Sequence, residues 1–208
     1  YAATSFGLKS KEYGGDDPRP AYLIDCDGRI DALRNRPVVY DAYTPNDGAI
    51  AVLNRLDDIK ERCIKDNAAP FHTLIAPDSF SGFCSFAITD AMGIKDTINA
   101  EGKREKGRKI GNLTLPTIED YGYEAEAVRK LLFELLLDIK KFANVIVTAH
   151  EVERYKVIPG KPGAPTVTQL DGYKLMATNK ISASMPTKFD EIYHFLPKEK
   201  IISAKIIR

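Results

Sequence analysis

The chain has 208 residues, 44% of them hydrophobic and 28% charged, which excludes an intrinsically disordered protein and suits one globular domain. The 30 Lys and Arg against 29 Asp and Glu leave a net charge of +1, so any nucleic-acid partner must be recognised by local clusters rather than by bulk charge. Three widely spaced cysteines without a CxxC pair argue against a disulfide framework and a structural zinc site, and predict a cytoplasmic protein.

The first half of the sequence alternates apolar runs with one amphipathic helix. Residues 21–25 and 70–75 predict buried strands, and residues 38–40 predict a shorter one. Residues 44–47 (TPND) predict a helix start, with the threonine as N-cap and the proline in the first turn. The helix then has one apolar face, made of Val52, Leu56, Ile59 and Cys63.

The middle of the sequence combines an unpatterned segment, a long helix and a β-branched run. Residues 88–116 are rich in Gly, Lys and Arg and lack a hydrophobic period, so we expect an irregular segment there. Residues 119–142 predict the longest helix, apolar on most sides. Residues 144–148 (NVIVT) predict a central parallel strand.

The remainder predicts a Gly- and Pro-rich loop at residues 157–165, followed by strands at residues 173–185, 191–195 and 201–207. Strands alternate with helices along the whole chain. This order predicts a single α/β domain, residues 1–208, with a mainly parallel sheet.

Polar side chains follow three of the predicted strands. Asp25 and Asp27 end the first strand, Asp78 and Ser79 follow residues 70–75, and His150 follows the NVIVT run. Because ligands bind at the carboxyl ends of parallel strands, we expect these groups to meet in one crevice. Such a set suits holding Mg²⁺ through water and orienting a water molecule against a phosphate.

Each of these elements also has a purely structural explanation. Asp25 and Asp27 can cap a turn, and Asp-Ser after an apolar run can mark a strand that gives way to a capped helix. A histidine such as His150 is often a hydrogen-bonded structural residue. The order and spacing of the three elements together favour the functional interpretation.

In this order, the segments YLIDCDG, TLIAPDS, NVIVTAHE and FDEIYHF resemble the RecA-like P-loop ATPases, from Tyr1 to about Phe195. The similarity is greatest to phage-encoded, single-domain nucleotide-binding proteins associated with single-strand annealing and recombination. The resemblance implies a RecA-like three-layer fold, ATP and Mg²⁺ as ligands, the host cytoplasm as location, and a ring or filament with sites completed between subunits.

The resemblance also implies a role for each site residue. Asp27 falls where the family has the carboxylate that activates water. Asp78 and Ser79 fall on the Walker B element that holds Mg²⁺, and His150 falls on the polar sensor of the γ-phosphate. Whether Asp25 or Asp27 is the catalytic acid stays open.

Two features depart from the family pattern. Pro77 lies within the Walker B strand and lacks an N–H, so we expect Asp78 to be displaced or the register to differ by one. The loop Gly-x-x-x-x-Gly-Lys-Ser/Thr is absent, but residues 1–6 (YAATSF) resemble the helix that follows it, so we expect the loop just upstream of Tyr1. The alternative is a protein that never had the loop, and the native sequence before Tyr1 distinguishes the two.

Two basic, Gly-containing segments predict contacts with a nucleic-acid backbone. The first falls where the family carries its first DNA-contacting loop and contains Lys103, Arg104, Lys106, Arg108 and Lys109. The second follows His150, where the second such loop lies, and contains Arg154, Lys156 and Lys161. Flexible basic loops suit single-stranded DNA without base readout, and Tyr155 is a candidate for base stacking. The alternative is that both segments are merely solvated charge.

The sequence therefore favours a protein that binds and hydrolyses ATP and binds DNA in phage recombination, annealing or replication. Two other classes stay open. The first is a catalytically silent RecA-like scaffold subunit of a larger assembly, which the absent loop and Pro77 would suit. The second is a small-molecule P-loop kinase, in which the basic segments are hard to explain.

Overall fold

A computed structural model of the protein describes residues 18–29, 38–95, 109–110, 113–114, 116, 118–158, 167–177, 181 and 189. Its main sheet has four strands, and every pairing between them is parallel. In spatial order the strands are β2 (Val38–Ala42), β1 (Ala21–Asp25), β3 (Thr73–Asp78) and β6 (Asn144–Ile146). The prediction of an α/β chain with a mainly parallel sheet is confirmed.

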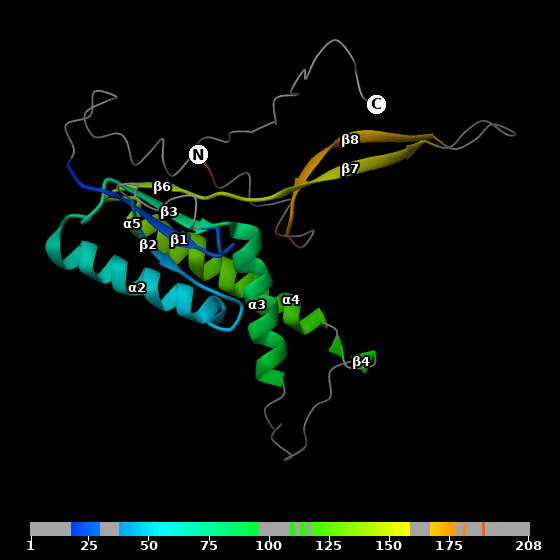
Figure 1. Cartoon of the computed structure of the whole chain (residues 1–208), viewed down its shortest axis with the longest axis horizontal. Coiled ribbons are helices and arrows are strands. Elements are labelled where there is room, and N and C mark those ends of the chain that lie inside the picture. Colours follow the sequence, from blue (N-terminus) through cyan, green and yellow to red (C-terminus); the bar gives the residue numbers. More distant parts are fainter. Residues whose placement is uncertain are drawn as a thin grey trace, which may run out of the picture.

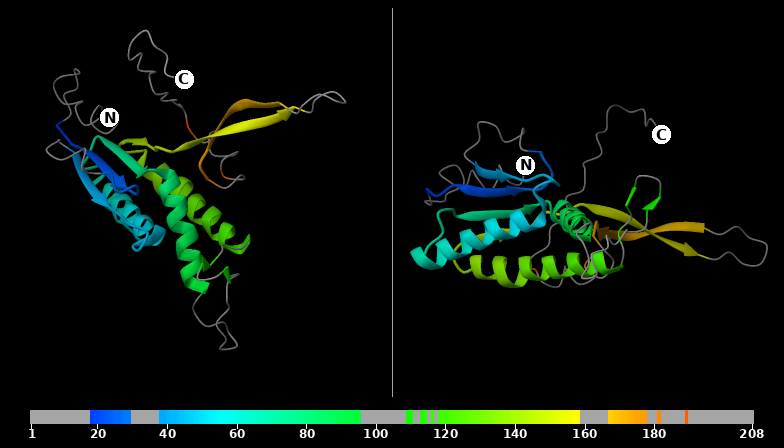
Figure 2. Two further views of the ribbon diagram at one scale, coloured as in Figure 1. Left: turned by 45° about the vertical axis from the view of Figure 1, so that its right-hand side comes forward. Right: turned by 90° about the horizontal axis from the view of Figure 1, so that it is seen from below.

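The described helices pack on one face of this sheet (Figure 1, Figure 2). They are α2 (Gly48–Asp66), α3 (Phe80–Lys95) and one long element made of α4 (Ile118–Arg129), the π-helical segment η3 (Lys130–Leu136) and α5 (Leu137–Ile139). One apolar cluster joins these helices to Tyr22, Ile24 and Leu74 on β1 and β3. The predicted apolar face of the first helix is confirmed, because Val52, Leu56, Ile59 and Cys63 are all buried on α2.

The other face of the sheet is apolar too. Leu23, Val38 and Ile75 are buried there, with Ile146 packed against them. Successive residues of β1 therefore face two different apolar environments, since side chains alternate along a strand. This burial on both faces explains why β1 and β3 appear in the sequence as continuous apolar runs.

Pro77 lies inside β3 and changes its register. Leu23 is opposite Ile75, but two residues further along β1, Asp25 is opposite Asp78. The additional residue on β3 forms a bulge, the kind of position at which a strand tolerates proline. Of the two consequences expected for Pro77, the change of register by one is confirmed, and it places Asp78 beside the end of β1.

The start of α2 differs from the prediction. Thr44 was expected to be the N-cap, but the helix begins at Gly48 and Asp47 precedes it. Thr44 instead donates from its backbone N–H and its hydroxyl to the Asp47 carboxylate, at 2.7 Å in both cases. The N–H of Gly48 donates to the Thr44 carbonyl, and the N–H groups of Ala49 and Ile50 donate to Asp90 of α3, which is 41 residues away in the sequence from Ala49.

The expectation of an irregular segment over residues 88–116 is wrong where the structure describes it. α3 continues to Lys95, and β4 (Lys109–Ile110) pairs antiparallel with β5 (Leu113–Thr114). Aromatic, Cys and Ala side chains form the buried side of α3, namely Phe80, Phe83, Cys84, Phe86, Ala87 and Ala91. Such a mixture lacks the aliphatic stripe by which a helix is usually recognised.

The segment after His150 forms a hairpin. Of the Gly- and Pro-rich loop predicted at residues 157–165, residues 157 and 158 end a strand and the others lie outside the described residues. β7 (Glu151–Ile158) and β8 (Val167–Leu175) pair antiparallel and project away from the sheet and helices (Figure 1). The strand predicted for residues 173–185 begins earlier, at Val167, and already ends at Leu175. Of the other residues in that range, the structure describes Met176 and Ala177, which lie in a bend, and Ile181, which is helical. The strands predicted for residues 191–195 and 201–207 lie outside the described residues.

The strand predicted to be central is at the end of the described sheet. β6 pairs with β3 alone among the described strands, over three residues, and its side chains are exposed or half-buried. No helix in the described part of the chain is long and apolar enough to cross a membrane.

Candidate active site

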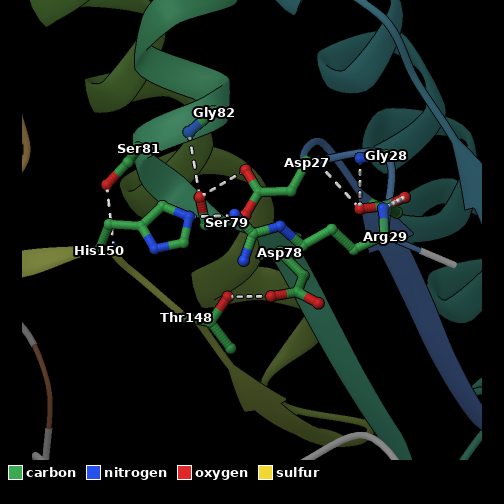
Figure 3. A network of polar contacts seen from close by, with 10 residues as sticks. Asp27, Gly28, Arg29, Asp78, Ser79, Ser81, Gly82, Thr148 and His150 are labelled. Atoms are coloured by element: carbon green, nitrogen blue, oxygen red, sulfur yellow. Dashed lines mark hydrogen bonds and ion pairs between the residues drawn. The ribbon is translucent and has the colours of Figure 1, made fainter. Parts of the chain in front are cut away.

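The carboxyl ends of β1, β3 and β6 bring the predicted site residues together (Figure 3). β3 lies between β1 and β6, so the segments that follow the three strands leave the same edge of the sheet. Two backbone hydrogen bonds join these segments. The N–H of Cys26 donates to the carbonyl of Asp78 at 2.6 Å, and the N–H of Phe80 donates to the carbonyl of Thr148 at 2.7 Å.

Asp25 holds the turn that follows β1. Its carboxylate accepts the backbone N–H groups of Asp27, Gly28 and Arg29 at 2.9, 3.1 and 3.1 Å, and the residue is only 2% exposed. Burial raises the pKa of this carboxyl above its ordinary value, and the nearby charge of Asp78 raises it further, although the N–H donors act in the opposite direction. The turn-capping explanation is therefore correct for Asp25.

Asp27 is the centre of the polar network. Its Oδ1 accepts a hydrogen bond from the Ser79 hydroxyl at 2.9 Å, and its Oδ2 lies 2.7 Å from Nε2 of His150. The side chain is 15% exposed, so Asp27 is not fully buried. Each carboxylate oxygen has two lone pairs, which leaves acceptor capacity for a further donor such as water.

Asp78 is oriented by a residue that the sequence analysis did not select. The hydroxyl of Thr148, which follows β6, donates to Oδ1 of Asp78 on the neighbouring strand β3. Thr148 is the polar residue that ends the NVIVT run, and this position was the signal available in the sequence. Asp78 and Thr148 thus form a second polar pair beside the Asp27 group (Figure 3).

His150 connects three parts of the molecule. Its side chain contacts Asp27, and its backbone N–H donates to the Ser81 hydroxyl on α3 at 3.1 Å. Its carbonyl accepts the N–H of Met176, directly after β8, at 2.8 Å. Because β7 begins at the next residue, His150 lies where the site meets the hairpin.

The donor atoms at this edge suit a hydrated Mg²⁺ ion. Asp78, Ser79 and Thr148 supply only oxygen, the donor that Mg²⁺ prefers. Within the described residues, no group of three or more His, Cys, Asp or Glu could enclose a metal ion. Magnesium usually retains several waters and binds one or two carboxylates together with phosphate oxygens, so the single carboxylate of Asp78 fits that mode.

The same side chains do not form a nucleophilic serine or cysteine site. In a Ser-His-Asp relay the imidazole lies between the hydroxyl and the carboxylate, whereas Ser79 and His150 both bond directly to Asp27. The nearest thiol, Cys26, is buried, and burial together with the surrounding acids raises its pKa far above the ordinary value. The arrangement is instead that of a carboxylate held in place by two donors.

The structure describes only some of the basic residues in each of the two predicted DNA-binding segments. Lys103, Arg104, Lys106 and Arg108 lie outside the described residues, and Lys109 begins β4. Arg154 and Lys156 lie on β7 and are exposed, while Lys161 is outside the described residues. Arg154 forms an ion pair with Asp171 of β8 at 2.8 Å, and Glu151 and Glu153 also lie on β7. The described part of this hairpin is therefore not strongly basic.

Comparison of the chain with protein-family models, with curated proteins and with solved structures finds no match.

Proposed function

We propose that the protein is a RecA-like ATPase with the three-layer fold of that group, which binds ATP with Mg²⁺, hydrolyses the γ-phosphate and binds single-stranded DNA in phage recombination, annealing or replication. The observation that carries this proposal is the environment of Asp27. One of its oxygens bonds to Ser79 after β3 and the other to His150 after β6. A carboxylate fixed in this way at the carboxyl edge of a parallel sheet suits the orientation of an attacking water.

Asp27 would accept a hydrogen bond, and then a proton, from the water. The water oxygen attacks the γ-phosphorus in line with the bond to the bridging oxygen, which breaks as ADP leaves. Ser79 and His150 keep the carboxylate in one orientation, so little reorganisation is needed when the water binds. Asp25 is unsuited to this role because three backbone N–H groups already occupy its carboxylate.

Asp78, with Ser79, would hold a hydrated Mg²⁺ ion, and Thr148 would keep the Asp78 carboxylate oriented. The ion, when bound, neutralises charge on the phosphate oxygens. The backbone N–H groups and lysine that grip the phosphates would come from the phosphate-binding loop that we propose just upstream of Tyr1.

His150 is proposed to sense the γ-phosphate and to transmit its loss to the hairpin. Its contacts support this role, because the side chain touches Asp27 while the carbonyl bonds to Met176 at the end of β8. A change at Asp27 can therefore reach the β7–β8 hairpin through one residue. Release of γ-phosphate contacts is a known way of switching the segments that follow a nucleotide site.

DNA binding is proposed to reside mainly in the first basic segment, Lys103 to Lys109, which lies between α3 and α4 in the sequence. Arg154, Lys156 and Lys161 of the hairpin region are proposed to contribute less, because Arg154 is paired with Asp171. Assembly into a ring or filament is proposed from the family resemblance alone.

The proposal is tested with the full-length protein by measuring ADP release from ATP over a range of Mg²⁺ concentrations, with and without single-stranded DNA. We expect Mg²⁺-dependent turnover in the wild type. Asp78→Ala should raise the Mg²⁺ concentration needed for half-maximal turnover by about 10- to 100-fold, the usual range when metal-site contacts are lost. Asp58→Ala, at an exposed position of α2, is the control and should behave as wild type.

Other results would favour the rival classes. ATP binding without turnover under all of these conditions would contradict the proposal and favour the silent scaffold. Turnover that requires a small-molecule acceptor and is indifferent to DNA would favour the kinase.

A further inference from the structure

Gly82 in the first turn of α3 lies unusually close to the end of β1. A Cβ atom on this residue would be 2.6 Å from the carbonyl oxygen of Cys26 and 2.8 Å from Oδ1 of Asp27. Contacts below 3.0 Å are essentially never made by real Cβ atoms, and the Cys26 atom belongs to the backbone, which cannot move aside like the end of a long side chain. The helix therefore approaches this closely because residue 82 has no side chain.

This close approach creates a chain of hydrogen bonds that ends on Asp27 (Figure 3). The N–H of Gly82 donates to the Ser79 hydroxyl oxygen at 3.1 Å, and the Ser79 hydroxyl donates to Oδ1 of Asp27 at 2.9 Å. The same turn contains Ser81, whose hydroxyl accepts the N–H of His150, the other partner of Asp27. One turn of α3 thus fixes both groups that hold the carboxylate.

We infer that Gly82 is a positioning residue, which lets the first turn of α3 hold Asp27 and His150 in their paired geometry for the proposed ATP hydrolysis. The inference rests on the proposed function of the site. A glycine within a helix is unfavourable relative to alanine, so its presence here calls for a structural reason, and the contact with Cys26 and Asp27 supplies one. Ala at this position would push Asp27 away from Ser79 and His150.

The same helix provides a matched control. Gly93 also lies in α3, and a Cβ there would meet nothing within 4 Å. Gly82→Ala and Gly93→Ala should raise intrinsic helix propensity alike, so a difference between them reports the contact at residue 82.

The experiment compares these two variants of the full-length protein with the wild type. For Gly82→Ala we expect kcat to fall by about 10- to 100-fold, the usual effect of misplacing a reacting group by about 1 Å. The Kd for ATP should stay within about twofold of wild type, since Asp27 is not a phosphate ligand in this account. Gly93→Ala should keep both constants.

A second measurement is independent of turnover. The imidazole ¹⁵N chemical shifts of His150 report its contact with Asp27, and a His150→Gln variant assigns them among the three histidines of the chain. Gly82→Ala should move these shifts toward those of Asp27→Asn, while Gly93→Ala leaves them unchanged. If Gly82→Ala does not fold, Ser79→Ala removes the same bond to Asp27 without adding an atom and should move the shifts in the same direction.

The possible failures can be told apart. A Gly82→Ala protein with wild-type kcat and unchanged His150 shifts would overturn the inference while leaving the proposed function intact. A wild type that does not hydrolyse ATP contradicts the proposed function, and the shifts then decide by themselves whether Gly82 positions the Asp27–His150 pair.

Discussion

At the scale of single residues, Asp25 and Asp27 show how two identical side chains acquire different tasks. Both follow the same strand, but the carboxylate of Asp25 is buried under three backbone N–H groups, whereas that of Asp27 faces Ser79 and His150. The difference comes from the path of the turn, in which Gly28 has a φ of 69°. A positive φ is readily adopted by glycine and allows the chain to fold back over Asp25.

The three cysteines lie too deep for thiol chemistry in the native protein. Cys26, Cys63 and Cys84 are 4%, 0% and 3% exposed, and burial raises the pKa of each thiol. Since the thiolate is the reactive form, we expect no cysteine to react with a disulfide reagent such as DTNB within minutes at pH 8, and all three to react in guanidinium chloride. The absorbance of the released chromophore measures both, and rapid reaction of even one thiol in the native protein would contradict the described packing.

Site residues were predictable where a strand pattern placed them. Asp27, Asp78, Ser79 and His150 each follow an apolar run, and the structure brings them together. Thr148, which ends the NVIVT run and bonds to Asp78 of β3, was not selected although its position was a signal. Ser81 and Gly82 were missed because their roles depend on how closely α3 approaches His150 and the end of β1. Such distances are set by tertiary packing, which leaves no local mark in the sequence.

At the scale of elements, a side chain of α3 caps the N-terminus of α2. The carboxylate of Asp90 on α3 accepts the N–H groups of Ala49 and Ile50 at 2.8 and 3.2 Å. Gly48 makes room for it, because a Cβ there would lie 2.0 Å from Oδ1 of Asp90. A negative charge at a helix N-terminus is also favoured by the helix dipole.

Removing this cap should destabilise the fold. We expect Asp90→Ala to lower the free energy of unfolding by about 1–2 kcal/mol, as for a lost N-cap. Asp90→Asn keeps an acceptor oxygen and should lose less. Urea unfolding followed by circular dichroism measures the change, with Asp58→Ala on the exposed side of α2 as the control. Equal midpoints for Asp90→Ala and the control would show that the cap contributes nothing.

Elements with one simple period were predicted well, and elements with mixed composition were not. β1 and α2 were recognised because their apolar residues follow a strand or helix pattern. α3 was missed because its buried residues range from Ala to Phe, and β7 was missed because charged residues interrupt it. The exposed hairpin buries little, so no alternation of apolar and polar residues was available to indicate it.

At the scale of the whole molecule, a net charge of +1 cannot hold a polyanion by itself. Any affinity for DNA must come from local clusters, above all the five cations of Lys103 to Lys109. On single strands, counterion release gives a slope of about −0.7 in log K against log[salt] for each phosphate contact, so five contacts predict roughly −3.5.

A salt titration of fluorescent oligonucleotide binding measures this slope. We expect alanine at Lys103, Arg104, Lys106, Arg108 and Lys109 together to flatten it while ATP binding is retained. Alanine at Arg154 and Lys156 should change it less, because Arg154 already has a partner in Asp171. An unchanged slope in the five-fold variant would mean that this segment is solvated charge. If the wild type does not bind the oligonucleotide at low salt with ATP present, the proposal of DNA binding is contradicted.

We propose that the ends of β1, β3 and β6 form one hydrolytic site around Asp27. In this account Asp27 acts on the water and not on the phosphates, so its charge matters for turnover and not for nucleotide affinity. Asp27→Asn keeps the shape of the side chain but removes its ability to take a proton.

The most direct test is therefore to measure kcat and the Kd for ATP in the full-length Asp27→Asn protein, with Asp58→Asn on α2 as the control. We predict that kcat falls by roughly 10²- to 10⁴-fold, the usual loss when general-base action is removed, while Kd stays within about twofold of wild type. Asp58→Asn should match the wild type in both constants. Wild-type turnover in Asp27→Asn would contradict the account and transfer the catalytic role to another acid.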